Sequence, residues 1–322
     1  MPQFSLLLGV AACGRGPGWV PPADLPWRPF YWARVTSDSA RFDRAAILLE
    51  VPLGRGGLAS LVQLDLAASG TMPEGFPLPA GMRSAPALRR GGQLYGLLAG
   101  EAHVAMTRSA GDSLGEDLTS REIGTLGLAN FESRALLLDF ARRRLAEVPS
   151  PTELSALLGP RTVTVPVEYA GDRVVLVLEG RSGRTYRALL DTGLSPFPLW
   201  ATRELWRDLT GLTGNEPGTS KLVLTGARGR LVFVTAAARQ ALRVGAWSFR
   251  PREVAYLSEG PAGAGLEDWP QPVDAVLGLA TLAPDGLVAL DLAHRRIGLV
   301  RTSDRKSHLS RPDEIPYVSA SQ

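Results

Sequence analysis

The chain has 322 residues, of which 45% are hydrophobic and 21% are charged, a composition typical of a globular protein long enough for two domains. Its net charge is only +3, and its basic residues are spread along the chain instead of forming a stripe, which argues against nucleic-acid binding. One cysteine excludes an intrachain disulfide, and three separated histidines argue against a zinc site. No GxxxxGK[ST] phosphate loop is present, so we expect no metal and no cofactor. The runs Arg142–Arg144 and Arg295–Arg296 are predicted to be solvated charges at strand ends.

The amino terminus carries an apolar run that ends at the single cysteine, Cys13. This run is too short to span a bilayer and is typical of the hydrophobic part of a secretory signal. Val10-Ala11-Ala12-Cys13-Gly14 resembles a bacterial lipobox, in which the cysteine is acylated, although Met1-Pro2-Gln3 lacks the basic residues of that pattern. The following Gly- and Pro-rich stretch is predicted to be a tether. We therefore expect a cell-envelope protein on the periplasmic side that meets the membrane only through a lipid anchor; secretion, or a buried strand with an incidental cysteine, is the alternative.

The first half of the chain is predicted to be strand-rich up to an aspartate loop. Apolar alternation predicts strands at 45–51 and 58–64, with a hairpin turn at Gly54–Gly57. The second strand leads into Gln63-Leu64-Asp65-Leu66-Ala67-Ala68-Ser69, where the aspartate is held among small residues.

The second half repeats this order after a connecting segment, Glu147–Pro160, which carries three prolines and a short helix signal. Strands are predicted at 163–169, 174–178 and 186–190, and the last leads into Leu189-Leu190-Asp191-Thr192-Gly193-Leu194-Ser195. A short helix at 201–209 and a hairpin at 224–230 are predicted further along. Trp200 and Trp206 are predicted to be core aromatics.

An internal repeat links the two halves. Leu126-Gly127-Leu128-Ala129 recurs as Leu277-Gly278-Leu279-Ala280. In each half an Asp-x-Ala-x-Arg-Arg segment follows, starting 12 residues after Gly127 at Asp139 and 13 residues after Gly278 at Asp291. Together with the two aspartate loops, this predicts two copies of one mostly β unit.

Residue by residue, the second copy resembles the aspartic protease superfamily in its retropepsin-like and pepsin-like branches. Leu189–Ser195 matches the hydrophobic-hydrophobic-Asp-Thr-Gly-x-Ser motif of that family, and Val276-Leu277-Gly278 matches its downstream hydrophobic-hydrophobic-Gly motif. The resemblance covers residues 160–302 and, more weakly, 40–147. It implies a mostly β fold with two similar aspartic-protease-type β-barrel lobes and a cleft between them.

The expected domain limits follow from the repeat and the resemblance. They are a signal and tether at 1–29, a degenerate lobe at 30–147, a linker at 148–160, a lobe with the Asp-Thr-Gly motif at 161–302, and a tail at 303–322.

The resemblance implies that Asp191 and Asp65 form an acid/base pair. Two carboxylates that share one water cannot both ionise cheaply, so the pair holds one proton. The ionised member takes a proton from the attacking water, while the protonated member donates to the peptide carbonyl. Thr192 would hydrogen-bond across to the opposite loop, Gly193 would allow a substrate backbone to approach, and Ser195 would orient the carboxylate.

The first loop departs from the family pattern. It keeps Asp65 and Ser69, but Leu66 stands where the family has threonine, and Ala67 stands where it has glycine. Leucine has no hydroxyl, so the first loop cannot make the hydrogen bond to the opposite loop that the threonine would make. Asp65 is therefore predicted either to be catalytic or to be a relic at a strand end. Gly127 and Gly278 are the expected supporting glycines of the two loops.

These features predict an aspartic-type endopeptidase that acts as a monomer on a peptide or protein substrate, without nucleic acid. Two alternatives remain open. One is a retropepsin-like homodimer that uses only the second copy. The other is a non-catalytic envelope lipoprotein that binds a peptide or protein partner in the cleft. The hairpin at 224–230 is the candidate for the flap that covers the cleft in the family.

Overall fold

The computed structural model shows a mostly β protein, which confirms the fold class predicted from the sequence. The residues that the structure describes are 24–37, 40–52, 59–66, 89–90, 93–94, 113–114, 122–127, 134–170, 173–181, 183–192, 197–226, 229–269, 271–284 and 286–301. Within these ranges, no helix is long and apolar enough to cross a membrane.

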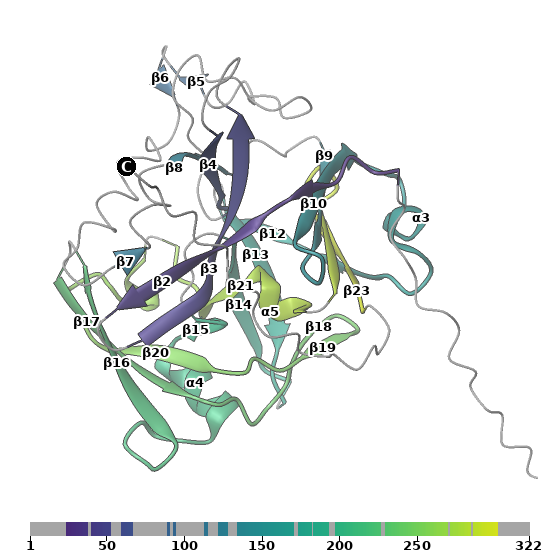
Figure 1. Cartoon of the computed structure of the whole chain (residues 1–322). Coiled ribbons are helices and arrows are strands. Elements are labelled where there is room, and N and C mark those ends of the chain that lie inside the picture. Colours follow the sequence, from purple (N-terminus) through teal and green to yellow (C-terminus); the bar gives the residue numbers. More distant parts are fainter. Residues whose placement is uncertain are drawn as a thin grey trace, which may run out of the picture.

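A six-stranded sheet takes three strands from each half of the chain (Figure 1). In spatial order its strands are β1 (Arg28–Pro29), β10 (Arg144–Pro149), β9 (Arg134–Asp139), β22 (Leu287–Asp291), β23 (Arg296–Val300) and β11 (Val163–Pro166).

The three strands from each half are arranged in the same way on either side of the central pair β9–β22. The antiparallel strands β9 and β22 pair Leu136 with Leu290 and Leu138 with Val288. The two edge strands are followed by matching backbone hydrogen bonds of 2.9 Å, from Phe30 N to Arg143 O and from Val167 N to Arg295 O. Both acceptor arginines have a left-handed φ of 51°. The two Asp-x-Ala-x-Arg-Arg turns therefore adopt one conformation.

A ten-stranded sheet belongs to the second half. Along its path lie β16 (Thr219–Gly226), β17 (Gly229–Ala236), β20 (Val254–Glu259), β15 (Leu199–Ala201), β21 (Ala275–Gly278), β14 (Thr185–Asp191), β13 (Arg173–Glu179), β18 (Leu242–Val244) and β19 (Trp247–Phe249), with β12 (Glu168–Ala170) paired to β13. The helices are short: α3 (Leu154–Leu158), α4 (Arg203–Thr210), α5 (Leu279–Leu282) and the 3-10 turn η3 (Leu266–Asp268).

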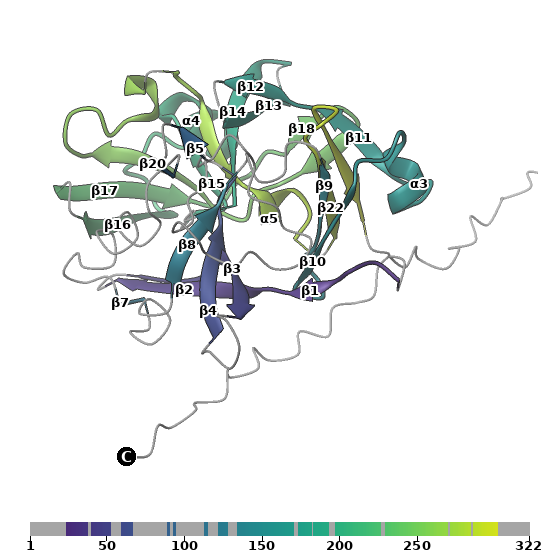
Figure 2. The same cartoon turned by 90° about the horizontal axis from the view of Figure 1, so that it is seen from above.

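A five-stranded sheet belongs to the first half, in the order β7 (Ser113–Leu114), β2 (Tyr31–Ser37), β3 (Ala40–Pro52), β4 (Ala59–Leu64) and β8 (Glu122–Leu126). Two further short strands, β5 (Arg89–Arg90) and β6 (Gln93–Leu94), pair with each other. Figure 2 shows β1 and β2 as one run that passes from the six-stranded sheet into the five-stranded sheet. One apolar cluster joins residues of all three larger sheets, including Leu64, Leu138, Leu190 and Leu290.

The predicted strands before both aspartate loops are confirmed. The segment connecting the halves starts later than predicted, because β10 continues to Pro149 and its residue Val148 is buried against Ala135. The predicted helix at 201–209 begins with strand β15, and only Arg203–Thr210 is helical. Trp206 is fully buried, as predicted, and its indole N–H donates to Val254 O at 3.0 Å.

The prediction that the arginine runs are solvated is wrong for Arg144 and Arg296. Their side chains are only 24% and 17% exposed, and each binds a fully buried aspartate, with Nε–Oδ2 distances of 3.0 Å to Asp139 and 2.8 Å to Asp291. A buried carboxylate is costly unless a cation and hydrogen bonds compensate for its lost hydration. The arginines therefore hold the sheet together at these turns.

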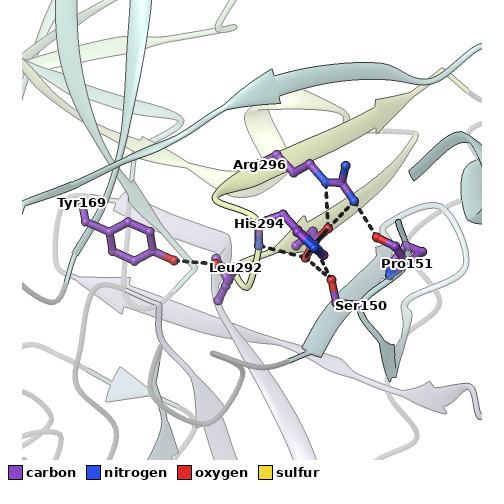
Figure 3. A network of polar contacts seen from close by, with 7 residues as sticks. Ser150, Pro151, Tyr169, Leu292, His294 and Arg296 are labelled. Atoms are coloured by element: carbon purple, nitrogen blue, oxygen red, sulfur yellow. Dashed lines mark hydrogen bonds and ion pairs between the residues drawn. The ribbon is translucent and has the colours of Figure 1, made fainter. Parts of the chain in front are cut away.

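The Asp291 turn is also tied to the segment that connects the halves (Figure 3). Ser150 Oγ donates to Asp291 Oδ1 at 2.5 Å, and the ring Nδ1 of His294 lies 3.0 Å from Asp291 Oδ2. Arg296 also donates to the carbonyl of Pro151 at 2.6 Å. Burial alone would raise the pKa of Asp291, but hydrogen bonds from Ser150, Arg296 and His294 outweigh it, so the pKa is lowered.

Candidate active site

Asp191 stands at the end of β14, an inner strand of the ten-stranded sheet. Strand β14 pairs with β13 on one side and, in parallel, with β21 on the other, where Asp191 lies opposite Gly278. Its successive apolar residues Leu189 and Leu190 point to opposite faces of the sheet, and both are buried because each face is packed: Leu190 lies in the main apolar cluster, and Leu189 lies in a second cluster with Leu266, Val273 and Val276. The Asp191 side chain is itself only 9% exposed.

Asp65 occupies the matching place in the first half. It directly follows β4, which pairs in parallel with β8 through Leu64 and Leu126. Asp65 is half-buried, and Gly127, which directly follows β8, is buried. In each half, therefore, the predicted aspartate lies at the end of a strand, and this strand pairs in parallel with the strand that leads to the predicted supporting glycine.

One buried hydrogen bond joins the two aspartate loops. The backbone N–H of Leu66 donates to Thr192 Oγ1 at 2.9 Å, across 126 residues of sequence. Leu66 and Thr192 are the residues immediately after Asp65 and Asp191, and both are buried, Leu66 completely. The structure thus brings the two predicted loops face to face and makes the cross-loop bond that was predicted for Thr192.

The equivalent side-chain hydrogen bond in the opposite direction, from position 66 to the Asp191 loop, cannot form because Leu66 carries no hydroxyl. Its side chain belongs instead to the main apolar cluster, which also contains Leu64 and Leu190. Leu66 therefore contributes a backbone hydrogen bond and apolar packing to the contact between the loops.

Gly278 contributes through its backbone. Its N–H donates to Pro198 O at 3.2 Å, and its φ of −64° is one that any residue can adopt. Among the described residues, an added Cβ would have its nearest neighbours at 3.6 Å, Pro198 O and Thr281 Oγ1. The backbone conformation at position 278 therefore does not require glycine.

The predicted site residues Gly193, Ser195, Ser69 and Cys13 lie outside the described residues, as does Ala67.

The predicted hairpin at 224–230 is confirmed as the β16–β17 pair, which extends to Gly226 opposite Gly229. Its residue Phe233 packs on Phe197, with ring centroids 4.8 Å apart. Phe197 follows the Asp191 loop in sequence and also meets Phe42 of β3 edge to face at 5.8 Å. An aromatic cluster consequently joins the hairpin, the end of the Asp191 loop and the first half of the chain.

No group of acidic, histidine or cysteine side chains suited to a metal ion occurs within the part of the chain that the structure describes.

Comparison with known proteins gives structural similarities only. Neither a protein-family model nor a curated protein matches the sequence. Solved structures similar to this one include basic 7S globulin from soybean, with 13% identity, coverage of 88% of this chain and 98% of that chain, and a TM-score of 0.43. They also include conglutin gamma, a basic 7S globulin from lupine seeds (10% identity, 86% and 96% coverage, TM-score 0.43), and an aspartic proteinase from Irpex lacteus (11% identity, 87% and 99% coverage, TM-score 0.39). All three TM-scores are below 0.5, so the function has to be argued from the residues of this chain.

Proposed function

We propose that this protein is an aspartic-type endopeptidase whose acid/base pair is Asp65 and Asp191. The observation that carries the proposal is the buried hydrogen bond from Leu66 N to Thr192 Oγ1, because it links the residues that directly follow the two aspartates. The matching parallel strand pairs that deliver the two aspartates support it. They also support the origin of the two halves as copies of one unit.

The chemistry follows from two carboxylates that share a water. Like charges at short range oppose double ionisation, so the pair carries one proton over a range of acidic pH. The ionised carboxylate removes a proton from the water as it attacks the peptide carbonyl, and the other carboxylate donates its proton to the carbonyl oxygen. The titration belongs to the pair, so the pH profile of hydrolysis should be bell-shaped and centred in the acidic range.

The single-chain pair is favoured over the retropepsin-like homodimer. In a dimer of second halves, the Thr192 hydroxyl would have to meet the loop of another molecule. In this structure it already accepts the Leu66 N–H of its own chain, and β9 and β22 pair within the same chain. The proposed active species is therefore a monomer.

A second candidate function is peptide or protein binding without hydrolysis. The observation that favours it is the fully buried Leu66 side chain at the position where the family has a hydroxyl. In this case the paired loops would persist as a binding framework. For either function we propose a lipid anchor at Cys13 in the cell envelope, which radiolabelled fatty-acid incorporation and its loss in Cys13→Ser would test.

The deciding experiment is hydrolysis of a fluorogenic peptide library between pH 3 and pH 7. Asp191→Asn and Asp65→Asn should each abolish turnover, and a statine-type inhibitor should block it, whereas Asp268→Asn, an exposed carboxylate outside both loops, should leave it unchanged. Turnover that survives Asp65→Asn would refute the pair. Peptide binding without turnover in the parent protein would favour the second candidate.

A further inference from the structure

The segment that leaves the Asp191 loop is held by a second contact, made by Thr281. The carbonyl of Pro198 accepts two hydrogen bonds, from Gly278 N at 3.2 Å and from Thr281 Oγ1 at 2.9 Å. Gly278 is also the residue that lies opposite Asp191 in the β14–β21 pair. Both ends of the loop, Asp191 and Pro198, are therefore bound to one short stretch of chain.

That stretch is itself firmly held. Thr281 belongs to α5, whose residues Leu279 and Leu282 are each 1% exposed in the main apolar cluster. The end of the helix is fixed by the indole N–H of Trp247, which donates to Leu282 O at 2.8 Å in a buried hydrogen bond. Because α5 is packed and tied at its end, the Thr281 hydroxyl is a fixed donor for the Pro198 carbonyl.

We propose that Thr281 is a positioning residue for Asp191, an inference that rests on the proposed function. The Pro198 carbonyl is bound by the N–H of Gly278, and Gly278 lies opposite Asp191 in the β14–β21 pair, so a displacement of Pro198 reaches Asp191 through Gly278. Removing the hydroxyl leaves the Pro198 carbonyl with the N–H of Gly278 as its remaining donor among the described residues. In the first half of the sequence, Asn130 stands three residues after Gly127, as Thr281 stands three after Gly278, and its amide can also donate a hydrogen bond.

Thr281→Val tests this because it removes the donor and keeps the branched shape. We expect faster amide hydrogen exchange at Gly278 and Leu66, with little change at Leu137 in the six-stranded sheet. In an active parent we expect kcat to fall several-fold while KM changes little, because Thr281 acts through Pro198 and not on the substrate. Thr281→Ser keeps the hydroxyl, so it should restore kcat and the amide exchange rates of Gly278 and Leu66 to the values of the parent protein.

A matched control is Thr162→Val. Thr162 Oγ1 also donates to a backbone carbonyl, that of Gly159, at 2.6 Å, but in the segment before β11. The Thr162→Val variant should therefore leave kcat and the amide exchange rate of Leu66 unchanged.

Three results would overturn the proposal: unchanged exchange at Gly278 and Leu66 in Thr281→Val, exchange raised equally throughout the chain, or a Thr281→Ser variant as impaired as Thr281→Val. Exchange does not depend on turnover, so it separates two failures. If the parent hydrolyses no peptide but the local exchange effect appears, the proposed function fails while Thr281 still positions the loop.

Discussion

The contact between the two loops can be tested directly by changing Thr192 to valine. Valine has almost the same shape as threonine but cannot accept the hydrogen bond from Leu66 N, which is buried and 2.9 Å from Thr192 Oγ1. An unsatisfied buried donor costs about 1–3 kcal/mol, and the added methyl group recovers about 0.8 kcal/mol. The difference of these two contributions is the expected effect, so Thr192→Val should lower the free energy of unfolding by roughly 0.2–2 kcal/mol.

Thermal and denaturant unfolding would measure this change. At about 2–4 °C per kcal/mol for a domain of 150–250 residues, the expected decrease in Tm is a few degrees. Thr192→Ser keeps the acceptor but loses a buried methyl group, so it is destabilised by a similar amount for a different reason. Unfolding alone does not separate the two variants.

Hydrogen exchange of the Leu66 amide does separate them. Thr192→Val should speed this exchange relative to Thr192→Ser by up to about 30-fold, the factor that corresponds to 2 kcal/mol. Equal exchange in the two variants would refute the argument that the Thr192 hydroxyl holds the opposite loop. If the loops position the catalytic pair, kcat should follow the same order.

Three further changes have defined outcomes. The pKa of Asp291 is lowered, so its ionised form contributes stability that is fully present above its ordinary pKa of 3.8 and is lost as the pH falls through the lowered pKa. Asp291→Asn should therefore cost about 3–5 kcal/mol at pH 7, and this cost should decrease as the pH is lowered below 3.8, as measured by urea unfolding. Gly278→Ala should change the free energy of unfolding by less than about 0.5 kcal/mol, because the Cβ has ordinary contacts at 3.6 Å; an unfolding loss above 2 kcal/mol would contradict this. Gly286→Ala, its matched counterpart, should cost about 1–3 kcal/mol in the same assay, since its Cβ would meet Val300 O at 2.5 Å.

The sequence predicted well those parts of the fold that depend on local patterns. The strand before Asp191 was predicted from its apolar run, and Leu189 and Leu190 are buried because both faces of the sheet are packed at this strand. The family resemblance implied a hydrogen bond from Thr192 to the opposite loop, and the structure contains one, in which Thr192 Oγ1 accepts the N–H of Leu66. The hairpin at 224–230 was predicted from its turn residues and is present as β16–β17.

The errors concern groups whose environment is set by distant parts of the chain. Arg144 and Arg296 looked like surface charges because nothing local shows that Asp139 and Asp291 are fully buried. The recurrence of an Asp-x-Ala-x-Arg-Arg segment in both halves was the available signal, since it places a cation at a fixed distance from each aspartate. The contact of Thr281 with Pro198 joins residues 83 positions apart and had no local signal.

Leu66 has no side-chain hydroxyl, yet it still joins the two aspartate loops, through its backbone N–H and through its apolar side chain. A symmetric lock would give each loop one hydroxyl acceptor and one backbone donor from the other loop. Here Thr192 accepts from Leu66, while the Leu66 side chain is fully buried in the apolar cluster that supports both loops. Apolar packing is less directional than a hydrogen bond, so the Leu66 side chain fixes the depth of this residue, while the hydrogen bond from Leu66 N fixes its orientation relative to Thr192. The second loop has directional contacts on both sides, through Leu66 N at Thr192 and through Thr281 at Pro198. These two hydrogen bonds hold the Asp191 loop at the residue after the aspartate and at the segment that leaves the loop, so Thr192 and Thr281 are the two side chains whose hydroxyl groups set its position.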